Sequence, residues 1–247
     1  MKTILITGGS RGIGAATAKL AAQQGYAVVV NYLNNKPAAE TVVTQIRNGG
    51  GDALAIQADI TKEQEVIQLF TAIQHTFGNL DVLINNAGIL KPQMRFENMS
   101  MERIIRVFHT NVFAQFLCTR EAIKQMALSK GGKGGAIVNV SSWAAKTGAA
   151  NEYIDYAASK GAIDTFTIGL AKELAHEGIR VNAVRPAYIY TGMHADGGEP
   201  DRIERMKKLI PLQRGGQARE VAEAILWLAS EKASYCTGTF IDLNGGI

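Results

Sequence analysis

The most informative segment of the chain for its fold is Thr3-Ile4-Leu5-Ile6-Thr7-Gly8-Gly9-Ser10-Arg11-Gly12-Ile13-Gly14. Its apolar first half has the length and composition of a buried strand, and an alanine-rich helical pattern follows it. Gly8, Gly12 and Gly14 have the spacing G-x-x-x-G-x-G, which allows a tight turn and close approach of the backbone to a pyrophosphate. A plain strand–helix turn is the alternative, but a strand, a glycine turn and a helix in this order predict a dinucleotide site.

The rest of the chain alternates short β-branched runs with helix-length segments. Strands are expected at Thr3–Thr7, Ala27–Tyr32, Ala53–Ala58, Val82–Asn86, Ala136–Ser141, Arg180–Val184 and Phe240–Leu243. Helices are expected at about Gly14–Gln24, Ala38–Asn48, Lys62–Thr76, Met101–Ser129, Ile154–His176 and Arg219–Ser230. This alternation predicts an α/β fold: a single doubly wound (Rossmann) domain over residues 1–247, with about seven parallel strands and helices on both faces.

The composition is that of an ordinary globular chain, with 47% hydrophobic and 19% charged residues among 247. The net charge of +4 comes without a long run of Lys or Arg, so we expect no nucleic-acid partner. No apolar stretch approaches the ~18 residues of a spanning helix, and the N-terminus lacks a signal-peptide pattern, so we expect no membrane association. The two cysteines suit a reducing compartment, which favours a cytoplasmic location. None of the four histidines has metal-ligand spacing, so no metal site is predicted.

One region, 187–216, breaks the alternation of strands and helices. It follows the sixth expected strand, at the end of the sheet where ligands bind in folds of this type. It also contains Gly197-Gly198-Glu199-Pro200. We interpret it as a mobile substrate lid, and an ordinary surface excursion is the alternative.

The second expected strand bears on which nicotinamide cofactor is bound. NAD sites usually place an acidic residue near the end of this strand, but here it ends with Asn31 and Tyr32, which we count with the cofactor site. Arg11 lies inside the glycine turn, where a guanidinium suits a 2′-phosphate. These residues favour NADP over NAD, and the alternative for Arg11 is a solvated turn residue.

Tyr156-Ala157-Ala158-Ser159-Lys160 lies in a long helical segment, so Tyr156 and Lys160 share one helix face. A nearby ammonium favours the phenolate, which predicts that the pKa of Tyr156 is lowered from its ordinary value of about 10. A tyrosine with a lowered pKa is suited to general acid–base catalysis. A tyrosine and a lysine at this spacing also occur by chance, so the argument needs further residues.

Further candidate site residues are polar and lie at the ends of two other expected strands. The fifth strand ends at Ser141-Ser142, and the hydroxyl of Ser142 is suited to hydrogen-bond a substrate oxygen beside the tyrosine. The fourth strand ends at Asn85-Asn86-Ala87-Gly88, which suits a cofactor along the sheet edge. Asn111 lies within the expected helix Met101–Ser129, where asparagine is a mediocre helix former. An exposed helix asparagine is its alternative interpretation.

Taken together and in this order, these motifs resemble the short-chain dehydrogenase/reductase family over Thr7 to Gly246, and most closely its bacterial group of 3-oxoacyl-carrier-protein reductases and glucose dehydrogenase-like enzymes. The resemblance implies hydride transfer between NADP(H) and a small carbonyl or alcohol substrate, with Tyr156 as general acid/base. It implies that Lys160 binds the nicotinamide ribose and lowers the tyrosine pKa, that Ser142 polarises the substrate oxygen, and that Asn111 holds a relay water. The cofactor residues that it implies are Gly8, Ser10, Arg11, Gly12, Ile13, Gly14, Asp59, Ile60, Asn86, Ala87, Gly88, Tyr156, Lys160, Ile189 and Thr191.

The sequence departs from the family pattern in two places. Pro186-Ala187 stands where family members carry Pro-Gly, and the segment from Ser142 to Tyr156 is one residue longer than in the acyl-carrier reductases. Ser141 is therefore an alternative to Ser142, and an acyl-carrier substrate is less strongly indicated. The substrate, the direction of the reaction and its stereochemistry are not predicted.

The resemblance also implies a homotetramer, with the two long helices and the last strand at its interfaces. Phe108, Val112, Phe113, Phe116 and Leu117 make the first of these helices apolar over a wide face, which a partner or this chain's own core would bury. The alternative functions are an NADP-binding regulatory or sensor protein with little turnover, and a sugar-nucleotide epimerase or dehydratase, for which the chain lacks room.

Overall fold

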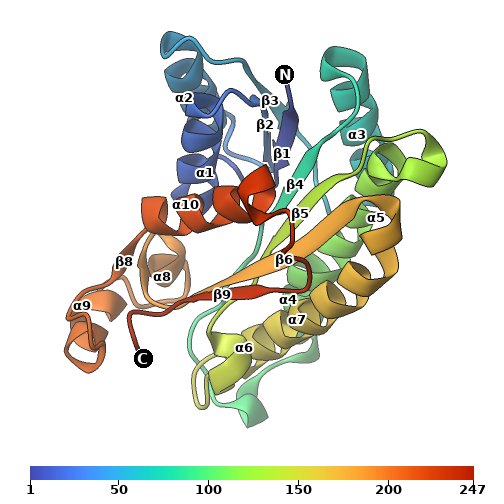
Figure 1. The fold of residues 1–247 in the computed structure, drawn as a ribbon. Helices are drawn as coiled ribbons and strands as arrows, with labels where there is room; N and C mark the ends of the chain where they lie inside the picture. The colour runs from blue at the N-terminus through green and yellow to red at the C-terminus, as the bar shows by residue number, and fades with distance from the viewer.

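The computed structural model describes residues 1–247, and a seven-stranded parallel sheet lies at its centre (Figure 1). The strands are β1 (Thr3–Ile6), β2 (Ala27–Tyr32), β3 (Ala53–Gln57), β4 (Val82–Asn85), β5 (Gly135–Val140), β6 (Ile179–Pro186) and β9 (Phe240–Leu243). Their order is β3-β2-β1-β4-β5-β6-β9, and every pairing is parallel. The order reverses between β1 and β4, which opens a crevice at their carboxyl ends. The predicted Rossmann fold is confirmed.

Helices cover both faces of the sheet (Figure 1). One face carries α1 (Gly12–Gln23), α2 (Lys36–Asn48) and α10 (Ala218–Ala229), and the other carries α3 (Glu63–Phe77), α4 (Met101–Phe108), α5 (Ala114–Met126) and α7 (Ile154–Leu174). Successive residues of β1 point to opposite faces, so Ile4 and Ile6 join one apolar core while Leu5 joins the other. The period-2 geometry of the strand thus divides the interior into two cores.

The expected helix Met101–Ser129 is not continuous, and this corrects the prediction. A π-helical segment, His109–Phe113, separates α4 from α5, and a short 3-10 turn at Leu128–Lys130 follows. A π-turn changes the direction in which the following side chains point and often occurs at functional positions. Asn111 lies in this segment and is completely buried, so the interpretation of an exposed helix asparagine is wrong.

The region 187–216 contains small elements of its own. They are β7 (Ile189–Tyr190), α8 (Met193–Asp196), α9 (Arg202–Met206) and β8 (Gly216–Gln217), and β7 pairs with β8. A one-turn helix, α6 (Ala144–Thr147), precedes α7, and further 3-10 turns occupy Phe96–Asn98, Ala175–Glu177, Lys207–Leu209 and Glu231–Ala233. The excursion leaves the sheet after β6 and returns at α10, on the side where the strands end.

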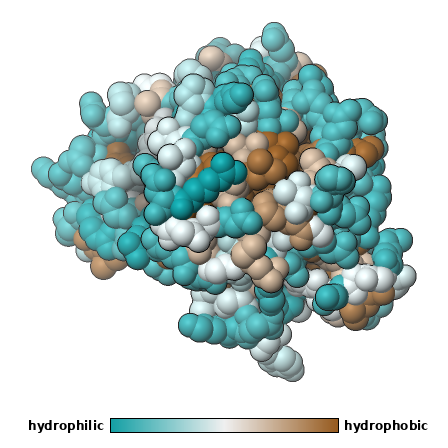
Figure 2. Space-filling view, turned by 90° about the horizontal axis from the view of Figure 1, so that it is seen from above, coloured by the Kyte–Doolittle hydropathy of each residue, from teal (hydrophilic) through white to brown (hydrophobic).

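The outer surface is mostly hydrophilic in the view from above, where apolar residues gather in one area near the middle (Figure 2). None of the helices combines the length and the hydropathy that a membrane span requires. The large aliphatic side chains of the strands are enclosed, as Ile4, Leu5 and Ile84 are completely buried.

Gly14 offers a test of how tightly the glycine turn is packed. A Cβ at Gly14 would lie 2.5 Å from the Gly8 carbonyl oxygen and 2.6 Å from Asn86 Nδ2. Because both neighbours belong to a fixed turn, we expect Gly14→Ala to lower the free energy of unfolding by about 2 kcal/mol. Gly169→Ala in α7 is the control: a Cβ there meets nothing within 4 Å, so helix propensity should raise stability by ~0.5–1 kcal/mol. Denaturant titration measures both, and equal stabilities would contradict the packing argument.

Candidate active site

The glycine turn is tied directly to the carboxyl end of β4. The Thr7 hydroxyl oxygen accepts hydrogen bonds from the backbone N–H groups of Asn86 and Ala87, both at 3.0 Å. Asn86 Nδ2 donates in return to the Thr7 carbonyl at 2.9 Å and to the Gly8 carbonyl at 3.2 Å. Gly8 has a φ of +61° and Gly12 one of +54°, conformations that glycine adopts without strain. These hydrogen bonds hold together the carboxyl ends of β1 and β4, the two strands between which the strand order reverses.

The remaining predicted cofactor residues line the same edge of the sheet or lie close to it. Ser10 lies in the turn and Ile13 at the start of α1, and both are partly exposed. Asn31 and Tyr32 are the last residues of β2, and Asp59 and Ile60 follow the end of β3. Asn31 and Tyr32 are buried, and the Asn31 amide donates to the Ala58 carbonyl at 3.1 Å. Their side chains therefore pack inside the sheet layers, and their backbone forms the edge of the site.

Arg11 is exposed and has a partner that the sequence did not indicate. Its guanidinium pairs with the Asp196 carboxylate of α8 at 2.5 Å. The Thr191 side chain also faces the glycine turn, since a Cβ at Gly12 would lie 3.4 Å from Thr191 Cγ2. The first part of the 187–216 excursion therefore rests against the predicted phosphate cradle.

Tyr156, Lys160 and Asn111 come together beside the end of β4. Lys160 Nζ lies 5.6 Å from the centroid of the Tyr156 ring and donates to the Val140 carbonyl at 2.7 Å. Asn111 Oδ1 accepts from the Ile89 N–H at 2.8 Å, and its Nδ2 donates to the Ile89 carbonyl and to the Ser159 hydroxyl. A Cβ at Gly88 would lie 3.3 Å from Asn111 Oδ1 and 3.6 Å from Lys160 Nζ. The absent side chain at Gly88 leaves space beside both groups.

The two adjacent serines at the end of β5 have different surroundings. The Ser141 hydroxyl donates to Asp164 Oδ1 at 2.6 Å, so it is directed toward α7 one turn beyond Lys160. The Ser142 hydroxyl donates weakly to the Pro186 carbonyl at 3.4 Å and interacts with Tyr156. Of the two candidates, Ser142 is therefore the one that faces the tyrosine.

Burial controls the charges of the tyrosine and the lysine. It raises the pKa of Tyr156, and the Ser142 hydroxyl offsets part of this effect. Burial also lowers the pKa of Lys160 to about 8, while the Asp164 carboxylate opposes the change. The predicted lowering of the tyrosine pKa is therefore wrong for this structure, because removal of water from the phenolate outweighs the hydrogen bond with Ser142.

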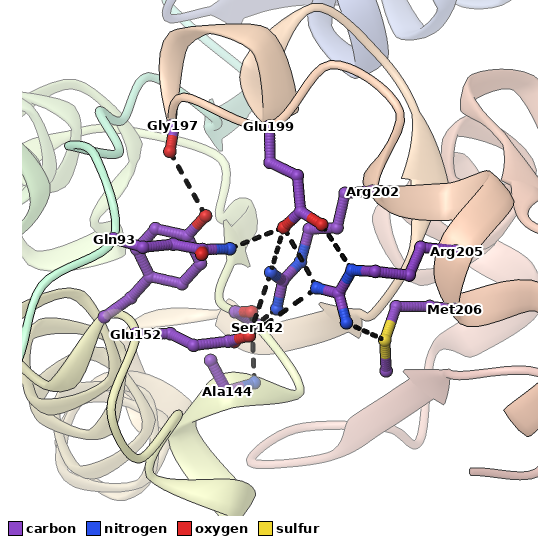
Figure 3. Close-up of polar contacts among 10 residues, drawn as sticks. Gln93, Ser142, Ala144, Glu152, Gly197, Glu199, Arg202, Arg205 and Met206 are labelled. Atoms are coloured by element: carbon purple, nitrogen blue, oxygen red, sulfur yellow. Dashed lines mark hydrogen bonds and ion pairs between the residues drawn. The ribbon is translucent and has the colours of Figure 1, made fainter.

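Ion pairs and hydrogen bonds attach the second half of the 187–216 excursion to the segment that precedes α7 (Figure 3). The Arg202 guanidinium pairs with Glu152 and, at 2.8 Å, with Glu199, and only 8% of its side chain is exposed. Gln93 donates to Glu199, and hydrogen bonds from Arg205 hold the pKa of Glu199 at about 2. The Tyr153 hydroxyl donates to the Gly197 carbonyl at 3.3 Å. These contacts close one side of the crevice, next to the segment that is one residue longer than in the acyl-carrier reductases.

Breaking this ion-pair cluster should loosen the excursion. Arg202→Met removes the buried cation that Glu152 and Glu199 share and leaves them only the exposed Arg205, so we expect the free energy of unfolding to fall by about 2 kcal/mol. Trypsin cleavage at Arg205, Lys207 and Lys208 should accelerate at least about tenfold. The matched control is Arg219→Met, because the Arg219–Glu223 pair is exposed on both sides. Equal cleavage rates for the two variants would show that the cluster does not hold this segment.

The chain is similar to known oxidoreductases over its whole length. A family model described as Enoyl-(Acyl carrier protein) reductase matches residues 8–247. The chain is 61% identical over 246 residues to an uncharacterized oxidoreductase, YgfF, of Escherichia coli (strain K12), with all of both chains covered. It is 40% identical to the 3-oxoacyl-[acyl-carrier-protein] reductase FabG of Staphylococcus aureus (strain Mu50 / ATCC 700699), covering 100% of this chain and 98% of that protein.

Two solved structures are similar over nearly the whole chain. A dehydrogenase/reductase from Sinorhizobium meliloti 1021 superposes with a TM-score of 0.91 at 33% identity, covering 99% of this chain and 94% of the other. A double mutant of a Serratia marcescens short-chain dehydrogenase/reductase superposes with a TM-score of 0.90 at 34% identity, covering 99% and 97%. Both agreements extend over the glycine turn, the sheet and the 187–216 excursion.

Proposed function

The chain belongs to the short-chain dehydrogenase/reductase family of oxidoreductases, and from this premise we propose that it transfers a hydride between NADP(H) and a carbonyl or alcohol, with Tyr156 as general acid/base. The observation that carries the proposal is the convergence of Tyr156, Lys160 and Asn111 beside the glycine turn. A protein that only sensed the cofactor would not need this arrangement.

The residues at the crevice fit a dinucleotide. Gly14 has no room for a side chain, so the N-terminus of α1 packs closely against the glycine turn and Asn86, and its free N–H groups are available to a pyrophosphate. Lys160 would hold the nicotinamide ribose, and Ile189 and Thr191 would contact the carboxamide. The nicotinamide supplies or accepts the hydride when bound.

The protein's own residues would manage the proton. The raised pKa of Tyr156 keeps its phenol protonated at neutral pH, so it can donate to a carbonyl oxygen that gains negative charge. Ser142 would hydrogen-bond the same oxygen and orient it. Asn111 would hold a water that links Lys160 to solvent.

Tyr156→Phe tests the acid/base role. The variant retains the ring and loses only the hydroxyl, so we expect kcat to fall by at least about a thousandfold while NADPH binding stays unchanged. The measurement is loss of NADPH absorbance over a panel of ketones, quinones and acyl thioesters, beside Tyr235→Phe, a change at a fully exposed tyrosine, as the control. Tight NADPH binding with no turnover by the native protein on any of them would support the alternative, an NADP-binding regulatory or sensor protein.

Arg11 and Asp196 together test the preference for NADP. If Arg11 binds the 2′-phosphate, Arg11→Met should weaken NADPH binding about tenfold to a hundredfold and leave NADH binding unchanged. Asp196 competes for the same guanidinium, so Asp196→Asn should strengthen NADPH binding. Fluorescence titration with both cofactors measures these affinities. Equal losses for NADPH and NADH in Arg11→Met would contradict the role of Arg11.

We also propose that the protein is a cytoplasmic homotetramer and that 187–216 serves as the substrate lid. Several large apolar side chains on α4, the π-helical segment, α5 and α7 are exposed, among them Ile105, Phe113, Phe116 and Ile168. The rings of Phe116 and Phe166 stack at 4.1 Å and join α5 to α7 on this surface. A second copy of the chain would cover it, and sedimentation velocity measures the assembly.

A further inference from the structure

Asp164 lies one helical turn after Lys160 on α7 and makes contacts that the proposed chemistry does not yet use. Its side chain is 14% exposed. One carboxylate oxygen accepts from the Ser141 hydroxyl at 2.6 Å, and the other accepts from Arg185 Nε at 2.8 Å. The Ser141 hydroxyl also lies 3.3 Å from the Lys160 carbonyl oxygen. Asp164 thus joins α7 to the carboxyl ends of both β5 and β6.

Its partner Arg185 is held firmly. The guanidinium carbon lies 3.8 Å from the centroid of the Phe240 ring, and a second ion pair links Arg185 to Asp242 at 3.3 Å. The next residue is Pro186, whose carbonyl accepts from the Trp143 N–H at 2.9 Å and from the Ser142 hydroxyl. The Asp164–Arg185 pair therefore connects α7 to the strand end that supports Ser142.

We propose that Asp164 is a positioning residue for the reaction: through Ser141 and Arg185 its carboxylate holds α7 against the strand ends beside Ser142, and it places a negative charge one helical turn after Lys160. The proposal rests on the proposed function, in which the Lys160 ammonium binds the ribose and stabilises the tyrosine's proton transfer.

The charges around Lys160 explain why a carboxylate is needed there. Burial has already lowered the pKa of Lys160 to about 8, and Asp164 is the one charged group that raises it. The other groups that face Nζ are the neutral phenol of Tyr156, the Val140 carbonyl and the amide of Asn111. Arg185 pairs with the carboxylate oxygen of Asp164 that does not bind Ser141. Without Asp164 the lysine pKa would fall further, so the ammonium would be lost as pH rises through a lower value.

The experiment compares Asp164→Asn with Asp242→Asn, which removes the other carboxylate partner of Arg185 and leaves α7 untouched. Two quantities are followed between pH 5.5 and 9.5: kcat/KM with the best substrate, and the Kd for NADPH by fluorescence without turnover. In the native protein and in Asp242→Asn, kcat/KM should fall and the Kd for NADPH should rise as pH rises through about 8. In Asp164→Asn the same loss should occur at least about one pH unit lower, which is tenfold in Kd at the intermediate pH. Asp164→Glu should restore the native profile.

The possible results are distinct. Identical pH profiles for Asp164→Asn and the native protein would overturn the proposal for Asp164 and leave the proposed function intact. A native protein that binds no NADPH would overturn the proposed function, and this inference with it. If Asp164→Asn fails to fold, Asp164→Asn/Arg185→Met removes the buried pair together, a change that cores often tolerate. That double variant must show the same shift of the pH profile.

Discussion

The close contact between the glycine turn after β1 and the carboxyl end of β4 is the constraint on which the rest of the structure depends. Gly14 packs against the Gly8 carbonyl and the Asn86 amide, and the Thr7 hydroxyl caps the backbone of the β4 end. Because parallel strands finish at one edge of the sheet, this contact places the phosphate cradle beside Gly88, and so beside Asn111 and Lys160.

Burial is the second constraint, and it affects the two titratable groups in opposite directions. The site removes water from both Tyr156 and Lys160, so the phenol becomes a weaker acid and the ammonium a stronger one. A neutral tyrosine is compatible with proton donation, but a neutral lysine would lose its attraction for a ribose. The Asp164 carboxylate, which is paired with Arg185, opposes the effect of burial on the pKa of Lys160.

Much of the site could be predicted because its residues lie at strand ends or on one helix face. The spacing of Tyr156 and Lys160 follows from helical periodicity, and Asn86 follows an apolar run whose end is evident. The π-helical segment at Asn111 could not be predicted, because nothing in residues 101–129 interrupts the helical pattern. Asp164 shares the helix face of Lys160, so the same periodicity would have revealed it, but not its pairing with Arg185.

Local sequence patterns are enough to predict the order of strands and helices along the chain, the glycine turn and the chemical groups available, because periodicity and local conformation depend on neighbours in the chain. The three-dimensional packing is needed to see that Ser142 rather than Ser141 faces the tyrosine, that Arg11 pairs with Asp196, and that Arg202 attaches region 187–216 to Glu152. The packing is also what raises the pKa of Tyr156. Hydrogen-bond partners and desolvation depend on residues far apart in the chain, which no local pattern records.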